Sequence, residues 1–171
     1  MADIVDAATR SRMMAGIQSK NTKPEILIRK ALHARGFRYS LHSSHLPGKP
    51  DIVMPKWRVV IFVHGCFWHW HGCAISKLPS SNTEFWRIKF LANKKRDQSA
   101  LDQLERLGWR VATVWECDTR GQKAKHQFAG LIQELTKWIR NRPDSNIWEP
   151  KIKVNTTPKL EIGVLVSTRI A

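Results

Sequence analysis

The chain has 171 residues, of which 42% are hydrophobic, so one domain with a packed core is expected and a largely disordered protein is excluded. Lysine and arginine number 29 against 14 acidic residues, and this net charge of +15 predicts a polyanionic partner, most commonly nucleic acid. No apolar run approaches the ~20 residues of a membrane span, and the N-terminus does not resemble a signal peptide, so we expect a cytoplasmic protein.

Helical and strand patterns alternate along the chain and predict a single α/β domain around a mixed sheet. The expected order is helices over 9–18 and 22–36, strands over 37–41, 51–54 and 59–63, a helix over 85–107, a strand over 109–116 and a helix over 122–140. Thr22 and Glu25 fit a capping box at the second helix, and the continuous apolar run 59–63 is typical of a central strand covered on both faces. Residues after 141 show no clear periodicity, so we expect them to be mobile or loosely packed.

The loop 64–73, which follows the predicted central strand, combines three histidines, two cysteines and three large aromatic residues. This mixture suits neither a core nor a bare surface loop, but it suits a loop that a metal ion folds. With the third cysteine, the loop offers a set that is normal for structural zinc: Cys66, His71, Cys73 and Cys117. A disulfide with one free thiol is the alternative, and the odd number of cysteines and the expected reducing compartment argue against it.

Two histidines of this loop and an aspartate that precedes it suggest phosphodiester chemistry. Asp51 opens a strand beside the central one, where a carboxylate can hold a divalent metal against a phosphate; taken alone, it would more often be a turn or capping residue. His64 and His69 are left over once the zinc ligands are assigned, and a histidine can activate water or donate a proton near neutral pH. For each histidine, a structural hydrogen bond is the alternative interpretation.

Aromatic residues gather beside positive charge in the same region. Phe67 and Trp68 lie in the loop, and Trp86 begins a basic helix that also carries Lys89. Rings beside cations can stack on nucleic-acid bases or wedge between them. For the tryptophans inside predicted strands and helices, packing in the core is the simpler interpretation: Trp109, Trp115 and Trp138.

Several short segments together form a specific signature. They are Ala-Thr-Arg-Ser at 8–11, Leu-Pro-Gly-Lys-Pro-Asp at 46–51, Val-Ile-Phe at 60–62 with His-Gly-Cys-Phe-Trp-His at 64–69, Thr-Glu-Phe-Trp at 83–86, Leu-Gly-Trp-Arg-Val at 107–111 and Trp-Glu-Cys at 115–117. With these segments the sequence resembles the very-short-patch-repair (Vsr) mismatch endonucleases. The resemblance covers residues 1–141, with 1–20 as a DNA-contacting arm, and leaves 142–171 as an unassigned tail.

The resemblance implies a restriction-endonuclease-like, three-layer α/β fold with structural zinc. The implied enzyme depends on Mg²⁺ and nicks one DNA strand 5′ to the thymine of a T·G mismatch that deamination of 5-methylcytosine leaves. Its implied partners are double-stranded DNA carrying that mismatch, mismatch-repair proteins and an associated cytosine methyltransferase. We expect it to act as a monomer, in the cytoplasm on the nucleoid.

The resemblance also implies roles for individual residues. Asp51 would be the magnesium ligand, aided by the main-chain carbonyl of Val63. His69 would activate water, His64 would assist at the phosphate, and Glu25 would be an accessory acid. Phe67, Trp68 and Trp86 would form a wedge that enters the duplex beside the mismatch. Met14 would enter from the opposite groove, and Lys89 would be a basic residue that contacts DNA.

The sequence departs from the family at several positions. The wider nuclease superfamily has an acid and a lysine on the central strand, where this chain has Phe62, Val63 and His64. Position 63 is often threonine in the family, so Val63 keeps the carbonyl and loses a hydroxyl, and Trp70 stands where a histidine is frequent. Two other functions stay open: a restriction-type DNA endonuclease of the same fold, and a zinc-stabilised DNA-binding module without chemistry. The aromatic wedge argues against the first, and Asp51 with His69 argues against the second.

Overall fold

The computed structural model describes residues 6–16, 20–141 and 145–150. Its centre is a mixed five-stranded sheet in the order β1 (Ser40–Leu41), β2 (Ile52–Met54), β3 (Val59–His64), β4 (Arg110–Trp115) and β5 (Ile147–Trp148). β1, β2 and β3 pair in antiparallel fashion, whereas β3 with β4 and β4 with β5 are parallel. The carboxyl ends of β3 and β4 therefore meet at one edge of the sheet, with His64 beside Trp115.

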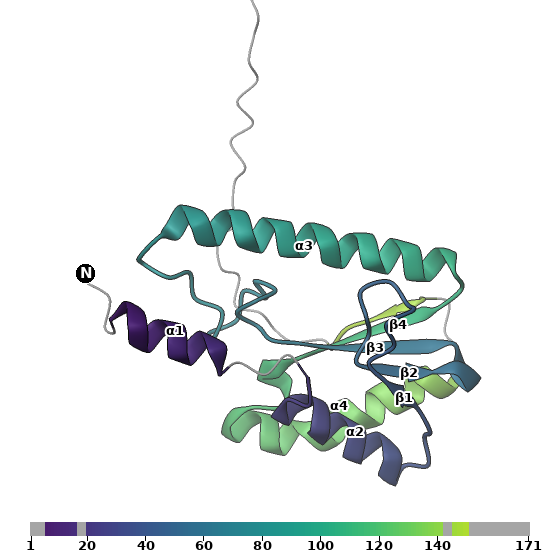
Figure 1. The fold of residues 1–171 in the computed structure, drawn as a ribbon. Helices are drawn as coiled ribbons and strands as arrows, with labels where there is room; N and C mark the ends of the chain where they lie inside the picture. Colours follow the sequence, from purple (N-terminus) through teal and green to yellow (C-terminus); the bar gives the residue numbers. More distant parts are fainter. Residues whose placement is uncertain (1–5, 17–19, 142–144, 151–171) are drawn as a thin grey trace, which may run out of the picture.

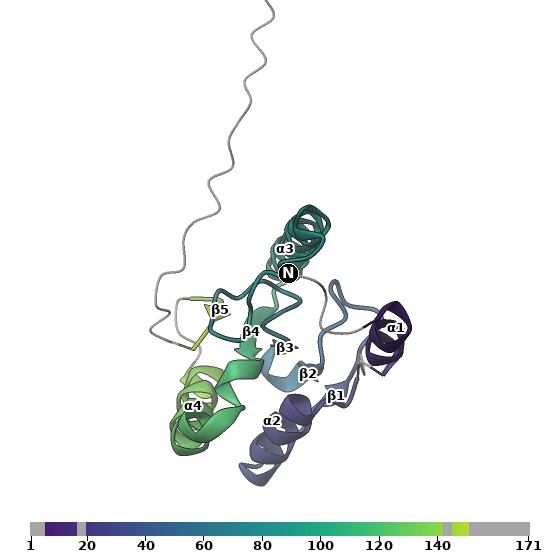
Figure 2. The same cartoon turned by 90° about the vertical axis from the view of Figure 1, so that its left-hand side faces the viewer.

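Helices cover both faces of the sheet and give three layers (Figure 1). α3 (Thr83–Arg106) lies on one face, while α2 (Lys23–Ala34) and α4 (Gly121–Asn141) lie on the other, as the end-on view in Figure 2 shows. The larger apolar cluster fills the space between the sheet, α2 and α4, and the smaller one lies between the sheet and α3. Both views place α1 (Ala7–Ala15) outside these layers. The predicted α/β architecture around a mixed sheet is confirmed.

Local sequence explains how these elements begin and where they pack. The Glu25 N–H donates to Thr22 Oγ1 at 3.5 Å and the Thr22 N–H donates to Glu25 Oε1 at 3.3 Å, so the predicted capping box starts α2. The first four residues of β3 are buried, as expected for a strand covered on both faces. Gly48 has a φ of +72°, and a Cβ there would lie 2.8 Å from the Cβ of Ala100. Only glycine therefore lets the turn before Asp51 pack against α3.

The observed elements differ from the predicted ones mainly in extent. α1 covers Ala7–Ala15 instead of 9–18, and the strand predicted at 37–41 is reduced to Ser40–Leu41. Phe37 is still tied to the end of α2, because its N–H donates to the Leu32 carbonyl at 3.2 Å. Two short 3₁₀ turns, Pro55–Trp57 and Glu116–Asp118, follow β2 and β4.

β5 is the element that the sequence did not predict. The residues after 141 were expected to be loosely packed, but Ile147–Trp148 pair with β4, and the Val111 N–H donates to the Asn146 carbonyl at 2.8 Å. Residues 142–144 and 151–171 of that expected tail lie outside the described residues. In the described part of the chain, no helix has both the length and the apolar character needed to cross a bilayer.

Candidate active site and metal centre

The four residues predicted to bind zinc meet at the carboxyl ends of β3 and β4. Their ligand atoms lie within 4.8 Å of one another: Cys66, His71, Cys73 and Cys117. Nδ1 of His71 lies 3.5 Å from the Sγ atoms of both Cys66 and Cys117. Tetrahedral zinc, with bonds of about 2.3 Å to sulfur and about 2.0 Å to nitrogen, has S···N separations of about 3.5 Å. The cluster therefore has the ligand types and the size that a tetrahedral metal ion requires.

The protonation chemistry of the thiols also favours a cation in this cluster. All three cysteines are described and all are free. The hydrogen bond from the Cys117 thiol lowers the pKa of Cys66 to about 4, and the same contact raises the pKa of Cys117. One thiol of the cluster, Cys66, therefore ionises easily, whereas ionisation of a second thiol is unfavourable. A bound cation removes this restriction, because several thiolates can then share its charge.

Asp51 lies immediately before β2 and reaches across to β3. Its Oδ2 accepts a hydrogen bond from the main-chain N–H of Val63 at 2.7 Å. Burial raises the pKa of this carboxyl to about 6; the Val63 N–H opposes the shift, and the nearby Glu25 carboxylate adds to it. A carboxylate whose charge is costly gains from a nearby cation. The structure therefore places the Asp51 carboxylate beside the main chain of Val63, the two residues predicted to hold Mg²⁺.

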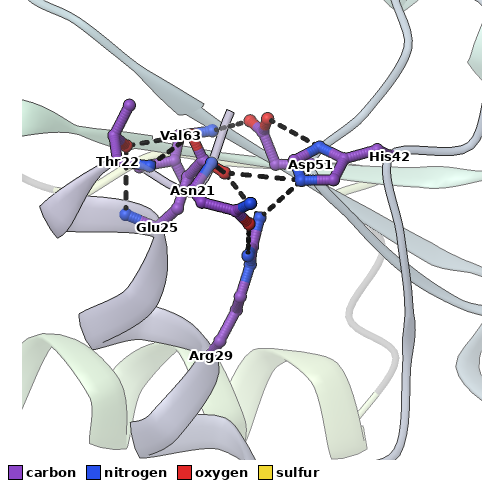
Figure 3. A network of polar contacts seen from close by, with 7 residues as sticks. All are labelled: Asn21, Thr22, Glu25, Arg29, His42, Asp51 and Val63. Atoms are coloured by element: carbon purple, nitrogen blue, oxygen red, sulfur yellow. Dashed lines mark hydrogen bonds and ion pairs between the residues drawn. The ribbon is translucent and has the colours of Figure 1, made fainter. Parts of the chain in front are cut away.

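Glu25, the predicted accessory acid, belongs to a polar network beside Asp51 (Figure 3). Its Oε2 accepts a hydrogen bond from Nη2 of Arg29 at 2.5 Å, and both side chains are less than a tenth exposed. The same guanidinium lies 3.0 Å from Nε2 of His42, and Nδ1 of His42 lies 4.0 Å from Oδ1 of Asp51. Glu25 is therefore held by an arginine, and His42 stands between that ion pair and Asp51.

The two predicted catalytic histidines form a stacked pair at the end of β3. The ring centroids of His64 and His69 are 3.7 Å apart and the ring planes differ by 5°. Burial lowers the pKa of His64 to about 3, and a charge on His69 acts in the same direction, so His64 is neutral at physiological pH. Nδ1 of His69 lies 2.6 Å from Oδ2 of Asp97, a residue of α3. Nε2 is therefore the His69 nitrogen that remains for proton transfer.

Asp97 is the ionised partner that orients His69. Burial by itself would raise the pKa of Asp97, but the hydrogen bond with His69, a charge on His69 and the nearby Arg96 guanidinium outweigh burial and lower the pKa. Asp97 continues a helix face whose members recur at intervals of four, three and four residues: Trp86, Phe90, Asn93 and Asp97. Sequence reasoning missed Asp97, and this spacing behind an aromatic pair is the signal that could have found it.

Two adjoining cavities connect these groups. The smaller cavity has a volume of about 510 Å³, and Trp68, Lys49 and Glu116 contribute to its lining. Its lining also includes the predicted catalytic and metal-binding residues Glu25, Asp51, Val63, His64 and His69. The larger, of about 900 Å³, lies on the Asp97 side and includes the basic residues Lys49, Lys94 and Arg96. The histidine pair lines both cavities. A phosphate can therefore reach a carboxylate, a histidine pair and cationic side chains at one place.

The three predicted wedge residues form one aromatic cluster next to these cavities. The ring of Phe67 is edge-on to the rings of Trp68 and Trp86, with both centroid distances 5.1 Å, and it also contacts Phe90. Nζ of Lys89 lies 5.6 Å from the centroids of Trp68 and Trp86. The wedge residues are half-buried, so their rings are packed and partly accessible at once. Met14, the remaining predicted contact, lies in α1, but its side chain is outside the described residues.

Several known proteins are similar in sequence to this chain over most of its length. Residues 2–75 match the family described as DNA mismatch endonuclease Vsr. The chain is 49% identical over 118 residues to the type II nicking enzyme V.XorIIP of Xanthomonas oryzae pv. oryzae, which covers 69% of this chain and 87% of that protein. It is 42% identical over 139 residues to DNA mismatch endonuclease Vsr of Escherichia coli K12, covering 81% of this chain and 88% of the relative. The type II nicking enzyme V.NmeAIP of Neisseria meningitidis is 42% identical over 136 residues, covering 79% and 97%.

The fold, the site and these relatives define the protein as a DNA endonuclease. DNA is its substrate, and the Cys/His cluster is a site that could hold a metal ion. The chain belongs to the Vsr family of DNA mismatch endonucleases. The predicted resemblance and the restriction-endonuclease-like α/β fold are thereby confirmed, and the interpretation as a DNA-binding module without chemistry is wrong.

Proposed function

We propose that the protein nicks one DNA strand 5′ to the thymine of a T·G mismatch left by deamination of 5-methylcytosine, and so starts very short patch repair. The observation that carries this proposal is that Asp51 and His69 line one cavity with Trp68, a member of a half-buried aromatic cluster. The first two residues suit phosphodiester hydrolysis, and the rings suit the opening of a weakly stacked base step. The name of the Escherichia coli relative supports a mismatch as the substrate.

In this proposal the reacting groups surround the scissile phosphate. Asp51 and the main-chain carbonyl of Val63 would hold Mg²⁺, which would supply positive charge at the phosphate and favour ionisation of water. His69 accepts the proton of the attacking water at Nε2, because its Nδ1 is held by Asp97 at 2.6 Å. His64, kept neutral by burial, assists the phosphate by hydrogen bonding. Glu25 contributes negative charge behind Asp51 and is fixed by Arg29.

The Cys/His cluster is proposed to hold structural zinc. Three of the four ligands, Cys66, His71 and Cys73, belong to the loop that carries the aromatic residues and His69, whereas Cys117 follows β4. The ion would therefore tie this loop to the sheet. The ion would contribute no chemistry of its own. It would fix the aromatic cluster and the proton-accepting histidine in one orientation relative to Asp51.

The aromatic cluster is proposed to select the mismatch. Opening a base step costs a few kcal/mol, and each base that stacks on a ring returns about 1–3 kcal/mol. The balance is near zero beside a poorly stacked T·G pair and unfavourable in intact DNA. Phe67, Trp68 and Trp86 would enter from one groove and Met14 from the other, with Lys89 attracting the phosphates.

The wider assembly completes the proposal. Residues 1–141 would form the endonuclease domain with 1–20 as a DNA-contacting arm, and β5 extends the packed region to Trp148. The enzyme would work as a monomer on the nucleoid in the cytoplasm. Mismatch-repair proteins and a cytosine methyltransferase are its proposed functional partners, since deamination of methylated cytosine creates the substrate.

Paired duplexes that differ only in T·G versus C·G at one position test this function. With Mg²⁺ present, wild type is expected to nick the thymine strand of the first duplex and to leave the second intact. Trp68→Ala should weaken binding to the T·G duplex by about 1–3 kcal/mol and binding to the C·G duplex much less. Equal cleavage of both duplexes would favour a restriction-type endonuclease. Equal loss of binding to both would mean that the rings only pack the loop.

A further inference from the structure

Strand register places His42 opposite Asp51. Leu41 pairs with Ile52 in the antiparallel β1–β2 ladder, so His42 and Asp51 face each other at its end, and the His42 N–H donates to the Asp51 carbonyl at 3.3 Å. His42 has a φ of 49°, in the left-handed region that costs about 1 kcal/mol or more for a residue other than glycine. The fold therefore holds this side chain beside the carboxylate at an energetic cost.

Arg29 determines which ring nitrogen of His42 carries the proton. Nη2 of Arg29 lies 3.0 Å from Nε2 of His42, and a guanidinium can only donate hydrogen bonds. Nε2 must therefore be the acceptor and carry no proton. The neutral ring then has its proton on Nδ1, which is the nitrogen that lies 4.0 Å from Oδ1 of Asp51.

Several contacts hold the guanidinium of Arg29, as Figure 3 shows. Arg29 is 8% exposed, its Nη2 donates to Glu25 at 2.5 Å and its Nη1 donates to Asn21 at 2.6 Å. Ligand atoms of Glu25, His42 and Asp51 lie within 4.8 Å of one another, which would otherwise suit a second metal ion. Arg29 already contacts both Glu25 and His42, so a metal there would have to displace a buried cation. The group therefore supports Asp51 and does not form a second metal site.

We infer that His42 is a positioning residue for Asp51, acting through the N–H that Arg29 fixes on Nδ1. This inference rests on the proposed role of Asp51 as the ligand of the catalytic metal. The Val63 N–H already holds Oδ2 at 2.7 Å. The Nδ1–H of the His42 ring would donate a hydrogen bond to Oδ1 of Asp51, through one water or after an approach of about 1 Å. With both oxygens oriented, the carboxylate would be held ready to bind the metal, which is how hydrogen-bonded ligands gain affinity.

Two variants of the same shape isolate this N–H. His42→Leu and His42→Asn both lose the ring nitrogen that accepts from Arg29, but asparagine keeps an N–H at the position of Nδ1. The measurement is the Mg²⁺ concentration that gives half-maximal single-turnover nicking of a duplex that wild type nicks. His42→Leu is expected to raise it by about 10–100-fold, as loss of a group that orients a metal ligand does, and His42→Asn by only a few-fold. The DNA affinity measured without Mg²⁺ should stay unchanged in both variants. His45→Leu, at an exposed position of the same loop, is the control and should leave the Mg²⁺ requirement unchanged.

The possible outcomes separate this inference from the function on which it rests. An unchanged Mg²⁺ requirement in His42→Leu, or equal increases in the leucine and asparagine variants, would overturn the role of the N–H. Asp51→Asn tests the metal ligand separately: near-normal nicking would overturn the proposed role of Asp51 as the ligand of the catalytic metal. An inactive Asp51→Asn beside a normal His42→Leu would overturn only the role of His42. If leucine prevents folding at this left-handed position, His42→Gly replaces it, since glycine adopts that conformation freely and also lacks the N–H.

Discussion

Replacing Asp51 by asparagine is expected to stabilise the Mg²⁺-free protein while it abolishes nicking. Burial raises the pKa of Asp51 from 3.8 to about 6. This difference corresponds to about 3 kcal/mol of unfolding free energy that the ionised carboxylate costs at neutral pH. Asparagine removes the charge and keeps an oxygen that can accept the Val63 N–H. For a domain of this size, about 3 kcal/mol corresponds to a rise in the melting temperature of about 6–12 °C.

The pH dependence follows from the direction of the shift. Because the folded pKa lies above the unfolded one, the folded protein between about pH 4 and pH 6 binds a proton that the unfolded chain has lost. The stability of wild type therefore falls as the pH rises through this window. The increase in unfolding free energy that Asp51→Asn gives should be absent below about pH 4, grow between pH 4 and 6 and be complete above pH 6.

Urea unfolding of both proteins between pH 4 and 8 measures this effect. The buffer should contain neither Mg²⁺ nor a chelator, so that the Cys/His cluster keeps any ion it holds. Asp102→Asn, at an exposed position on α3, is the matched control and should change little. Added Mg²⁺ should stabilise wild type but not Asp51→Asn, because only wild type keeps the carboxylate that binds it. Equal unfolding free energies at pH 8 would refute the reasoning and show that Arg29 already balances the charge of Asp51.

Two further predictions concern the other parts of the site. Purified protein should contain about one zinc ion per chain, and Cys117→Ser should lose the ion and unfold at a lower temperature; metal analysis with thermal unfolding checks this, and unchanged stability without metal would contradict it. Asp97→Asn should lower the nicking rate at saturating Mg²⁺ by about 100-fold or more, because His69 loses the partner that orients its ring. DNA affinity should stay within a few-fold of wild type, and an unaltered rate would show that Asp97 only packs α3 against the loop.

Short-range features of this protein could be predicted from the sequence because their causes are local. The capping box at Thr22 and Glu25 lies within four residues, and the apolar run of β3 identifies a covered strand by itself. Residue type also identified the Cys/His cluster, although Cys117 lies 51 residues from Cys66. The chain has only three cysteines, so few combinations of ligands exist, and thiolate with imidazole specifies a narrow class of metals.

Tertiary structure alone decided the partners of the reacting groups. The chain has 14 acidic residues, so nothing in residue type selects Asp97 as the partner of His69, which lies 28 residues away. The contact exists because α3 crosses the sheet face at the end of β3. His42 reaches Asp51 only through the β1–β2 register, and Ile147–Trp148 become a strand only because the edge of β4 offers main-chain hydrogen bonds. Two-residue strands carry no periodicity, so their pairing is determined by the packed sheet and not by their own sequence.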